Sequence, residues 1–413
     1  MLDFRPPKDT PALIGLAKLF LPVILKVDLQ GMRIEVIGDG LERFRSLRGK
    51  RTIVCPNHPN RHDPQVMFAF SKLAGEDFNF LAAREVFDYD NGWNGFWLQH
   101  LGCYSVVRGA PDRESFKTTK SLLVAGKKKL VIFPEGEISR QNDTLMPLEC
   151  GVPTLAFWAL DELQKTDAGA NVFLMPVATK YTYRESIRDE LERSIYKLEE
   201  RLGLSTNVQD SLYRRFRSIA QALLQALEKE YNVKPGAQAT LNDRIVGLRS
   251  TILKNIAAYL QVELPLGLST LDCVRVLRNH LDDFIYNDEN DLSAYQRKIH
   301  DEKAEKVKGI YRDLDRVVNF ISIYDGYLKE RLTQERFADV IDRFEVEVFG
   351  RNTIKGPRLV LIDIGRPISL IEQYPSYKTN KKAVLQKLTE ELSLQISTML
   401  EALENKRSPI LID

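Results

Sequence analysis

Hydrophobic and polar positions follow two alternating periods between residues 30 and 184. Apolar or alternating segments typical of β-strands lie at residues 32–38, 52–55, 78–85, 103–109, 129–140 and 171–181. The segment at residues 129–140 ends in a glycine-containing turn. Segments with helical periodicity separate most of them, at residues 64–75, 92–102, 113–127 and 151–163. Because strands alternate with helices, the pattern predicts a layered α/β domain.

The pattern becomes helical from about residue 185 to residue 350. Apolar residues repeat there at three- and four-residue steps, as at Val208, Leu212, Phe216, Ile219, Leu223 and Leu227. A further long helix is expected over residues 292–331. Residues 356–370 then have a strand pattern and residues 381–405 a helical one. One strand and one helix cannot form a core alone, so we expect this strand to return to the first sheet.

The predicted organisation therefore has four parts. These are an N-terminal segment (1–29), the first part of the α/β domain (30–184), an α-helical insertion (185–350), and a return strand with a C-terminal helix (351–413). The N-terminal segment lacks the usual form of a signal peptide. Its apolar run, residues 11–25, is shorter than the roughly 20 residues that span a bilayer. Two interpretations stay open for it: a helix in the plane of a membrane surface, or a helix packed on the domain core.

Composition narrows the function classes. The net charge is +2, so no strong overall field favours nucleic acid. The four cysteines, Cys55, Cys103, Cys150 and Cys273, are scattered and form no CxxC pair. This pattern favours neither a zinc framework nor a disulfide scaffold, and it is typical of a reducing, intracellular setting.

Candidate chemistry concentrates in residues 56–64, which read PNHPNRHDP. A metal site on a helix is disfavoured because His58 precedes Pro59, and the residue before a proline is pushed out of helical geometry. Asp63 with Pro64 is a favoured helix start, which places His58 on a loop after a buried strand. There His58 would act as a general base and Asp63 would orient its ring. A turn histidine beside a capping aspartate is the structural alternative.

Other polar residues follow strands elsewhere in the same region. Arg108 ends one predicted strand, and Glu135, Gly136 and Arg140 follow another. Two arginines at strand ends could hold a phosphate through paired hydrogen bonds, and Glu135 could accept a hydrogen bond from a polyol hydroxyl. Each of these residues could also belong to an ordinary loop or turn.

Four segments in this order resemble the glycerolipid acyltransferases, and among them most closely the bacterial lysophosphatidate acyltransferases. NHPNRHD, from Asn57 to Asp63, resembles the family's HxxxxD motif. GCYSVVRG resembles its second motif, VIFPEGEISR its Phe-Pro-Glu-Gly turn, and FLMPVA its fourth motif, while IDIGRPI resembles a late strand of the domain. The resemblance covers about half the chain, and the first and third motifs are specific together.

The resemblance implies a central mixed sheet flanked by helices, with a large α-helical insertion. It also implies transfer of a fatty acyl group from a thioester of CoA or acyl carrier protein to a lysophosphatidate or glycerol phosphate. His58 and Asp63 would be catalytic; Asn57, Arg108, Glu135, Gly136 and Arg140 would bind the acceptor. No metal and no cofactor is expected. The partners would be membrane lipids and the acyl donor, without nucleic acid, on the cytoplasmic side of a membrane, peripheral or monotopic.

Two departures from the family keep alternatives open. Glu137 stands where many members have threonine, and a carboxylate beside a phosphate is unfavourable unless Arg108 or Arg140 pairs with it. An acceptor without phosphate is therefore an alternative, and thioester hydrolysis is another. The insertion matches no part of the family pattern, so a non-catalytic protein that binds a membrane or a partner is the third. The sequence leaves open the donor, the chain length, the acceptor, the role of the insertion and the oligomeric state.

Overall fold

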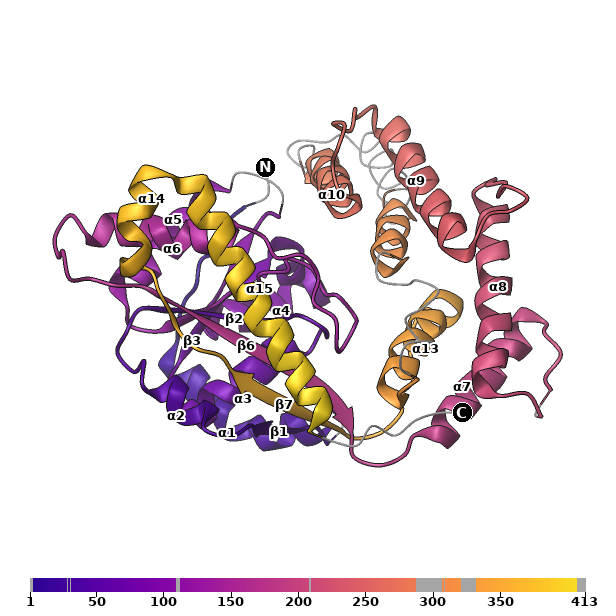
Figure 1. Cartoon of the computed structure of the whole chain (residues 1–413), viewed down its shortest axis with the longest axis horizontal. Helices are drawn as coiled ribbons and strands as arrows, with labels where there is room; N and C mark the ends of the chain where they lie inside the picture. Colours follow the sequence, from indigo (N-terminus) through magenta and orange to yellow (C-terminus); the bar gives the residue numbers. More distant parts are fainter. Residues whose placement is uncertain are drawn as a thin grey trace. The chain divides into compact units, whose positions relative to one another are not determined.

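A computed structural model describes residues 3–27, 29, 31–108, 112–207, 209–286, 307, 309–320 and 332–406. The chain divides into two compact units (Figure 1). The α/β unit comprises Phe4–Arg184 and Pro357–Pro409. The helical unit comprises Glu185–Gly356.

The α/β unit is organised around one mixed sheet. Its strands are β1 (Arg33–Val36), β2 (Thr52–Pro56), β3 (Phe78–Ala83), β4 (Cys103–Val106), β5 (Lys129–Val131), β6 (Phe173–Tyr183), β7 (Arg358–Ile364) and β8 (Ile368–Ser369). Their spatial order is β1-β7-β6-β2-β5-β3-β4, with β8 beside β6. Most pairs are parallel, but β7 and β8 each run antiparallel to β6. The predicted fold class is confirmed, including the additional helical region.

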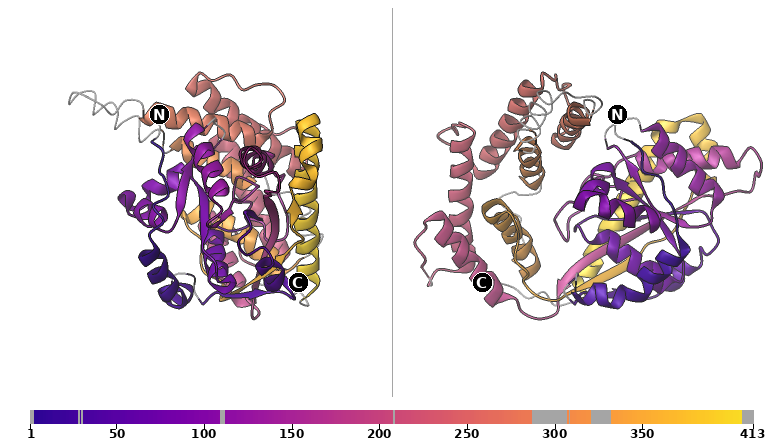
Figure 2. Two further views of the ribbon diagram at one scale, coloured as in Figure 1. Left: turned by 90° about the vertical axis from the view of Figure 1, so that its left-hand side faces the viewer. Right: turned by 180° about the vertical axis from the view of Figure 1, so that it is seen from behind.

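Helices cover both faces of the sheet (Figure 2). One face carries α1 (Pro11–Val27), α2 (Gly40–Arg45), α3 (Asp63–Ala74) and the short helices η1 (Arg84–Gly92) and α4 (Trp93–His100). The other carries α5 (Arg113–Ala125), α6 (Gly151–Leu163), η2 (Ile371–Gln373), α14 (Tyr374–Thr379) and α15 (Lys381–Asn405). Alternation along β2 supplies both cores, because Val54 faces one and Ile53 and Cys55 face the other.

The helical unit lies in sequence between two neighbouring strands. Tyr183 near the end of β6 pairs with Arg358 at the start of β7. Between them come α7 (Arg188–Leu202), α8 (Leu212–Glu230), α9 (Leu241–Leu260), α10 (Thr270–Tyr286) and α13 (Gln334–Phe349). Ser211, Thr240 and Thr333 each accept a hydrogen bond from a first-turn amide, which explains three of these helix starts. Of the helix expected over 292–331, residues 307 and 309–320 are helical, and the remainder lies outside the described residues.

The observed elements differ from the predicted ones at the ends of particular strands and helices. The strand expected at residues 103–109 ends at Val106. The expected cap of α3 is wrong by one residue, because His62 is the N-cap and Asp63 is already helical. The carboxylate of Asp63 is therefore not used as a cap, and it is available for the contacts described below.

Candidate active site

The candidate site lies where four neighbouring parallel strands end. These strands stand in the order β2-β5-β3-β4, so their carboxyl ends share one edge of the sheet. His58 follows β2, Glu135 follows β5, Glu85 follows β3 and Arg108 follows β4. In open α/β sheets this edge is the usual place of binding and catalytic residues. Residues distant in sequence are thus brought to one place by the topology.

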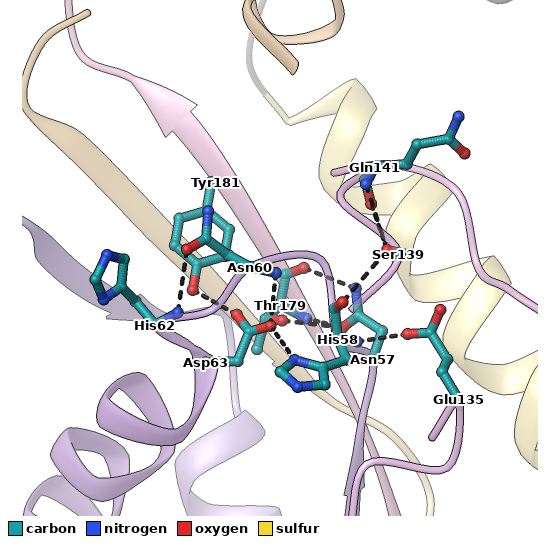
Figure 3. A network of polar contacts seen from close by, with 10 residues as sticks. All are labelled: Asn57, His58, Asn60, His62, Asp63, Glu135, Ser139, Gln141, Thr179 and Tyr181. Carbon is teal, nitrogen blue, oxygen red and sulfur yellow. Dashed lines mark hydrogen bonds and ion pairs between the residues drawn. The ribbon is translucent and has the colours of Figure 1, made fainter. Parts of the chain in front are cut away.

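His58 and Asp63 form a direct pair (Figure 3). The imidazole Nδ1 lies 2.7 Å from Oδ2 of Asp63. The same oxygen accepts a hydrogen bond of 2.8 Å from the backbone N–H of Asn60, within the loop that joins β2 to α3. Asp63 is fully buried, whereas the His58 side chain keeps some exposure. In the neutral ring, a proton on Nδ1 shared with Asp63 leaves Nε2 free to accept a proton.

The second oxygen of Asp63 is also occupied. Oδ1 accepts a hydrogen bond from the hydroxyl of Tyr181, a residue of β6. Asp63 thus accepts from three donors: an imidazole, a backbone amide and a phenol. A buried carboxylate without such donors would be strongly destabilising, so these contacts explain how the charge can be held inside the domain.

The backbone of His58 is fixed from the β5 side. Its N–H donates to Oε1 of Glu135, and its carbonyl accepts a 2.9 Å hydrogen bond from the N–H of Ser139. Phe133 stacks on the imidazole, with ring centroids 4.1 Å apart and planes at 20°. One face of the ring is therefore covered by Phe133, and its edge is turned toward Asp63.

Glu135, which the sequence predicts to bind the acceptor, has a fully buried carboxylate. It accepts from two backbone amides, those of His58 and Met146. Burial raises the pKa of Glu135 to about 7, and the two amide hydrogen bonds oppose that rise. Both carboxylate oxygens are used as acceptors inside the domain. Glu135 therefore ties the β5 loop to the loop of His58.

Asn57 is likewise used inside the domain. Its Nδ2 donates to the carbonyl of Thr179, and its Oδ1 accepts from the N–H and the hydroxyl of Thr179 at 2.7 and 3.0 Å. Asn57 is buried. Asn57, which the sequence predicts to bind substrate, thus joins the end of β2 to β6 at Thr179, two residues before Tyr181.

Arg108 is paired with two carboxylates. Its guanidinium contacts Glu85, lies 2.7 Å from Oε1 of Glu137 and donates to the carbonyl of Gly136 at 3.2 Å. Burial disfavours its charge, but the two carboxylates outweigh burial and raise the pKa of Arg108 above its usual value. Arg108 is therefore the arginine that pairs with the carboxylate of Glu137.

Arg140 and His62 also lie in the region where the sequence predicts the site. Arg140 follows on the same loop as Glu135, with its backbone in the left-handed region at φ 54°. His62 lies on the other side of Asp63 from His58 (Figure 3). Burial, and then the positive charges of Arg61 and Arg358, lower the pKa of His62 to about 4. His62 is therefore neutral near pH 7, but Nδ1 of its ring has no carboxylate partner comparable to Asp63.

The described part of the chain contains no group of three or more His, Cys, Asp or Glu side chains arranged to hold a metal ion. The polar arrangement at the sheet edge is instead one imidazole paired with a buried carboxylate, while Arg108 follows β4 at the same edge. Such an arrangement can take a proton from a hydroxyl group and stabilise the imidazolium that results.

Comparison with known families agrees with this chemistry. The model of the Acyltransferase family matches residues 33–180. These residues carry an acyltransferase domain. No curated protein matches the chain. The matched segment of the acyltransferase domain runs from β1 into β6 and includes His58, Asp63, Arg108 and Glu135.

Sequence reasoning missed several residues of the α/β unit that surround the pair. Tyr181, Phe133 and Ser139 contact Asp63 or His58, yet none was singled out. Phe133 lies within a motif that was recognised, so its position was available. Tyr181 belongs to a long apolar strand, and nothing in its local pattern distinguishes it from a core residue.

Proposed function

We propose that the protein transfers a fatty acyl group from a thioester to the hydroxyl of a glycerolipid acceptor. Nε2 of His58 takes the hydroxyl proton while the acceptor oxygen attacks the thioester carbonyl. The tetrahedral intermediate collapses, the C–S bond breaks, and an ester C–O bond remains. The imidazolium of His58 then returns the proton to the leaving thiolate. Asp63 holds the ring by Nδ1 throughout and stabilises its positive form.

The single observation that carries this proposal is the His58–Asp63 contact of 2.7 Å at the carboxyl end of β2. A turn histidine beside a capping aspartate is a poor description of it, because Asp63 does not cap α3. Three donors hold the carboxylate, and its place beside a partly exposed ring suits general-base chemistry. The match to the Acyltransferase family supplies the reaction class.

For the acceptor we propose lysophosphatidate or glycerol phosphate, bound near Arg108, Gly136 and Arg140. Glu135 and Asn57 would act on this site indirectly, through the loop of His58. A phosphate at Arg108 must compete with Glu85 and Glu137, which already pair with the guanidinium. That pairing favours a second candidate, a lipid alcohol without phosphate, whose hydroxyl would not need a free arginine.

The test is an acceptor comparison with the full chain. Acyl-CoA and acyl carrier protein thioesters would each be offered with lysophosphatidate, glycerol 3-phosphate and monoacylglycerol, and ester products measured by mass spectrometry. We expect transfer to the two phosphorylated acceptors at rates well above those with monoacylglycerol, and unchanged rates in the presence of a metal chelator. Transfer only to monoacylglycerol would establish the second candidate. Release of free fatty acid without any ester would instead show thioester hydrolysis.

We also propose that α1 rests on the cytoplasmic surface of a membrane, which would supply the lipid acceptor. No helix among the described residues is long and apolar enough to cross a bilayer. Helix α1 buries Ile14 and Leu21 but leaves five large apolar side chains exposed, most of them at three- and four-residue spacing: Leu16, Leu19, Phe20, Val23 and Val27. An apolar helix face of this kind suits the boundary between headgroups and acyl chains.

Substituting both Leu19→Asp and Phe20→Asp is expected to weaken binding to anionic phospholipid vesicles by at least about tenfold, since each side chain gives up apolar burial in the bilayer. Sedimentation with vesicles measures the bound fraction. Leu394→Asp on α15 is the matched control, because Leu394 is 68% exposed and Leu19 is 70% exposed. Equal loss in the control, or no loss in the double variant, would remove α1 as the contact surface.

A non-catalytic binding protein built on this domain remains the alternative from another class. The helical unit motivates it, because the family match ends before that unit begins. The complete His58–Asp63 pair argues for catalysis, and absence of any product in the acceptor comparison would argue for binding alone.

A further inference from the structure

Tyr181 contacts Asp63 from the side opposite His58 (Figure 3). It lies near the end of β6, beyond the segment that matches the acyltransferase model. Its backbone is held by Asn142, whose Oδ1 accepts from the Tyr181 N–H at 2.6 Å and whose Nδ2 donates to the Tyr181 carbonyl. The hydroxyl therefore reaches Asp63 from a fixed strand position.

The chemistry of this contact has a defined direction. Burial, followed by the charge of Asp63, raises the pKa of Tyr181 well above its ordinary value, so the phenol keeps its proton and donates it to Oδ1. A carboxylate that accepts at both oxygens cannot rotate without losing a hydrogen bond. Oδ2 is thereby kept toward Nδ1 of His58. The donor also withdraws some negative charge from Asp63, which sets how strongly Asp63 supports the imidazolium.

Titratable and charged groups face the phenol from β7, from the start of α3 and from the loop after β2. Arg358, from β7, lies over the Tyr181 ring with its guanidinium carbon 5.1 Å from the centroid. His62 at the start of α3 is neutral near pH 7. His58 lies across Asp63, and Glu135 is bonded to the backbone of His58. Arg358 thus places a positive charge over the phenol ring, and this charge opposes the rise in the pKa of Tyr181 without outweighing it.

We propose that Tyr181 is a positioning residue for acyl transfer, which fixes Asp63 against His58 through its hydroxyl. The kinetic test of this role rests on the proposed function, whereas the contact of Tyr181 with Asp63 does not depend on it. The phenol oxygen touches neither substrate nor reacting atoms; it acts through Asp63. Sequence patterns did not indicate this role, and the strand that supplies Tyr181 is continuous with the connection to the helical unit.

The test is Tyr181→Phe, which keeps the ring and its contact with Arg358 and removes the hydroxyl alone. We expect kcat to fall about tenfold with KM little changed, as for loss of one hydrogen bond to a charged group. Activity requires neutral His58 and is lost as the pH falls. Since Asp63 would then hold more negative charge against the imidazolium, the midpoint of this acidic limb should move to higher pH.

Tyr104→Phe is the matched control. Tyr104 is also fully buried in the α/β unit, and its hydroxyl bonds to Thr119 at 2.7 Å, away from the site. The control should lower thermal stability to a similar degree but leave the acidic limb in place. A Tyr181→Phe profile that superimposes on the unmodified one, or an equal activity loss in both variants without a shifted limb, would overturn the proposal.

A second measurement keeps the inference separate from the proposed function. The ring nitrogens of His58 can be followed by NMR against pH, with His58→Gln used for assignment, whether or not any acyl transfer is found. The titration midpoint of the ring should rise in Tyr181→Phe. If transfer depends on His58 but the ring titration is unchanged in Tyr181→Phe, the proposed function stands and this inference fails.

Discussion

Replacing His58 with alanine is expected to lower kcat on the order of 10⁴-fold, the upper end of what a general base contributes. No other described side chain offers a free imidazole nitrogen backed by a buried carboxylate at this sheet edge. The variant should fold, because His58 is linked to neighbouring loops by its backbone N–H and carbonyl, which alanine keeps. Product formation under single-turnover conditions measures the chemical step directly.

The control for that result is His62→Gln. His62 lies in the same loop, four positions after His58, and is the other histidine close to Asp63. His62 is half-buried, but its ring lacks an orienting carboxylate and takes no proton in this mechanism, so its replacement should change kcat by no more than about threefold. A large loss of kcat in His62→Gln with little loss in His58→Ala would show that His62, rather than His58, takes the hydroxyl proton.

The second large effect is expected for Asp63→Asn, with kcat lowered on the order of 10²- to 10³-fold. The amide oxygen can still accept from His58 and Asn60, because the Tyr181 hydroxyl can turn and accept from the amide nitrogen. The ring orientation is then largely retained. The loss comes from the missing negative charge, which no longer stabilises the imidazolium of the transition state.

Asp161→Asn provides the comparison for Asp63→Asn. Asp161 on α6 also accepts from a tyrosine hydroxyl, that of Tyr374 at 2.8 Å, and it pairs with Lys378 far from His58 in the sequence. Its replacement should leave single-turnover rates unchanged. If Asp63→Asn retained full activity in the same assay, the carboxylate would be a structural group only, and the general-base assignment of His58 would lose its partner.

The fold could be read from the sequence wherever one period dominated a segment. The helices expected at residues 151–163 and 381–405 occur as α6 and α15 with those bounds, because both combine an apolar stripe with clear ends. The mixed sheet and its flanking helices follow from the alternation of strands and helices. Strand ends do not follow from the sequence in the same way, as at Val106, since hydrogen-bond partners rather than residue types decide where a ladder stops.

The candidate site was only partly readable. His58 and Asp63 lie close in sequence, so their pairing could be inferred from a short motif. Glu135 could not be placed, because its partners are backbone amides of His58 and Met146 that any sequence would supply. Tyr181 reaches Asp63 across the fold, and the pairing of Arg108 with Glu85 depends on the order of β3 and β4. Contacts of that kind follow from topology rather than local pattern.

The direct pairing of Tyr183 with Arg358 has a consequence for how this chain tolerates change. The two strands form a hairpin whose connection happens to be an entire helical unit. Closing a loop costs only about 0.6 kcal/mol more for each doubling of its length, so the ladder, rather than the connection, holds the hairpin together. The connecting sequence is therefore exchangeable in principle, from a short turn to a folded module, while the register that presents Tyr181 to Asp63 stays the same. Length variation in this protein should accumulate at that point.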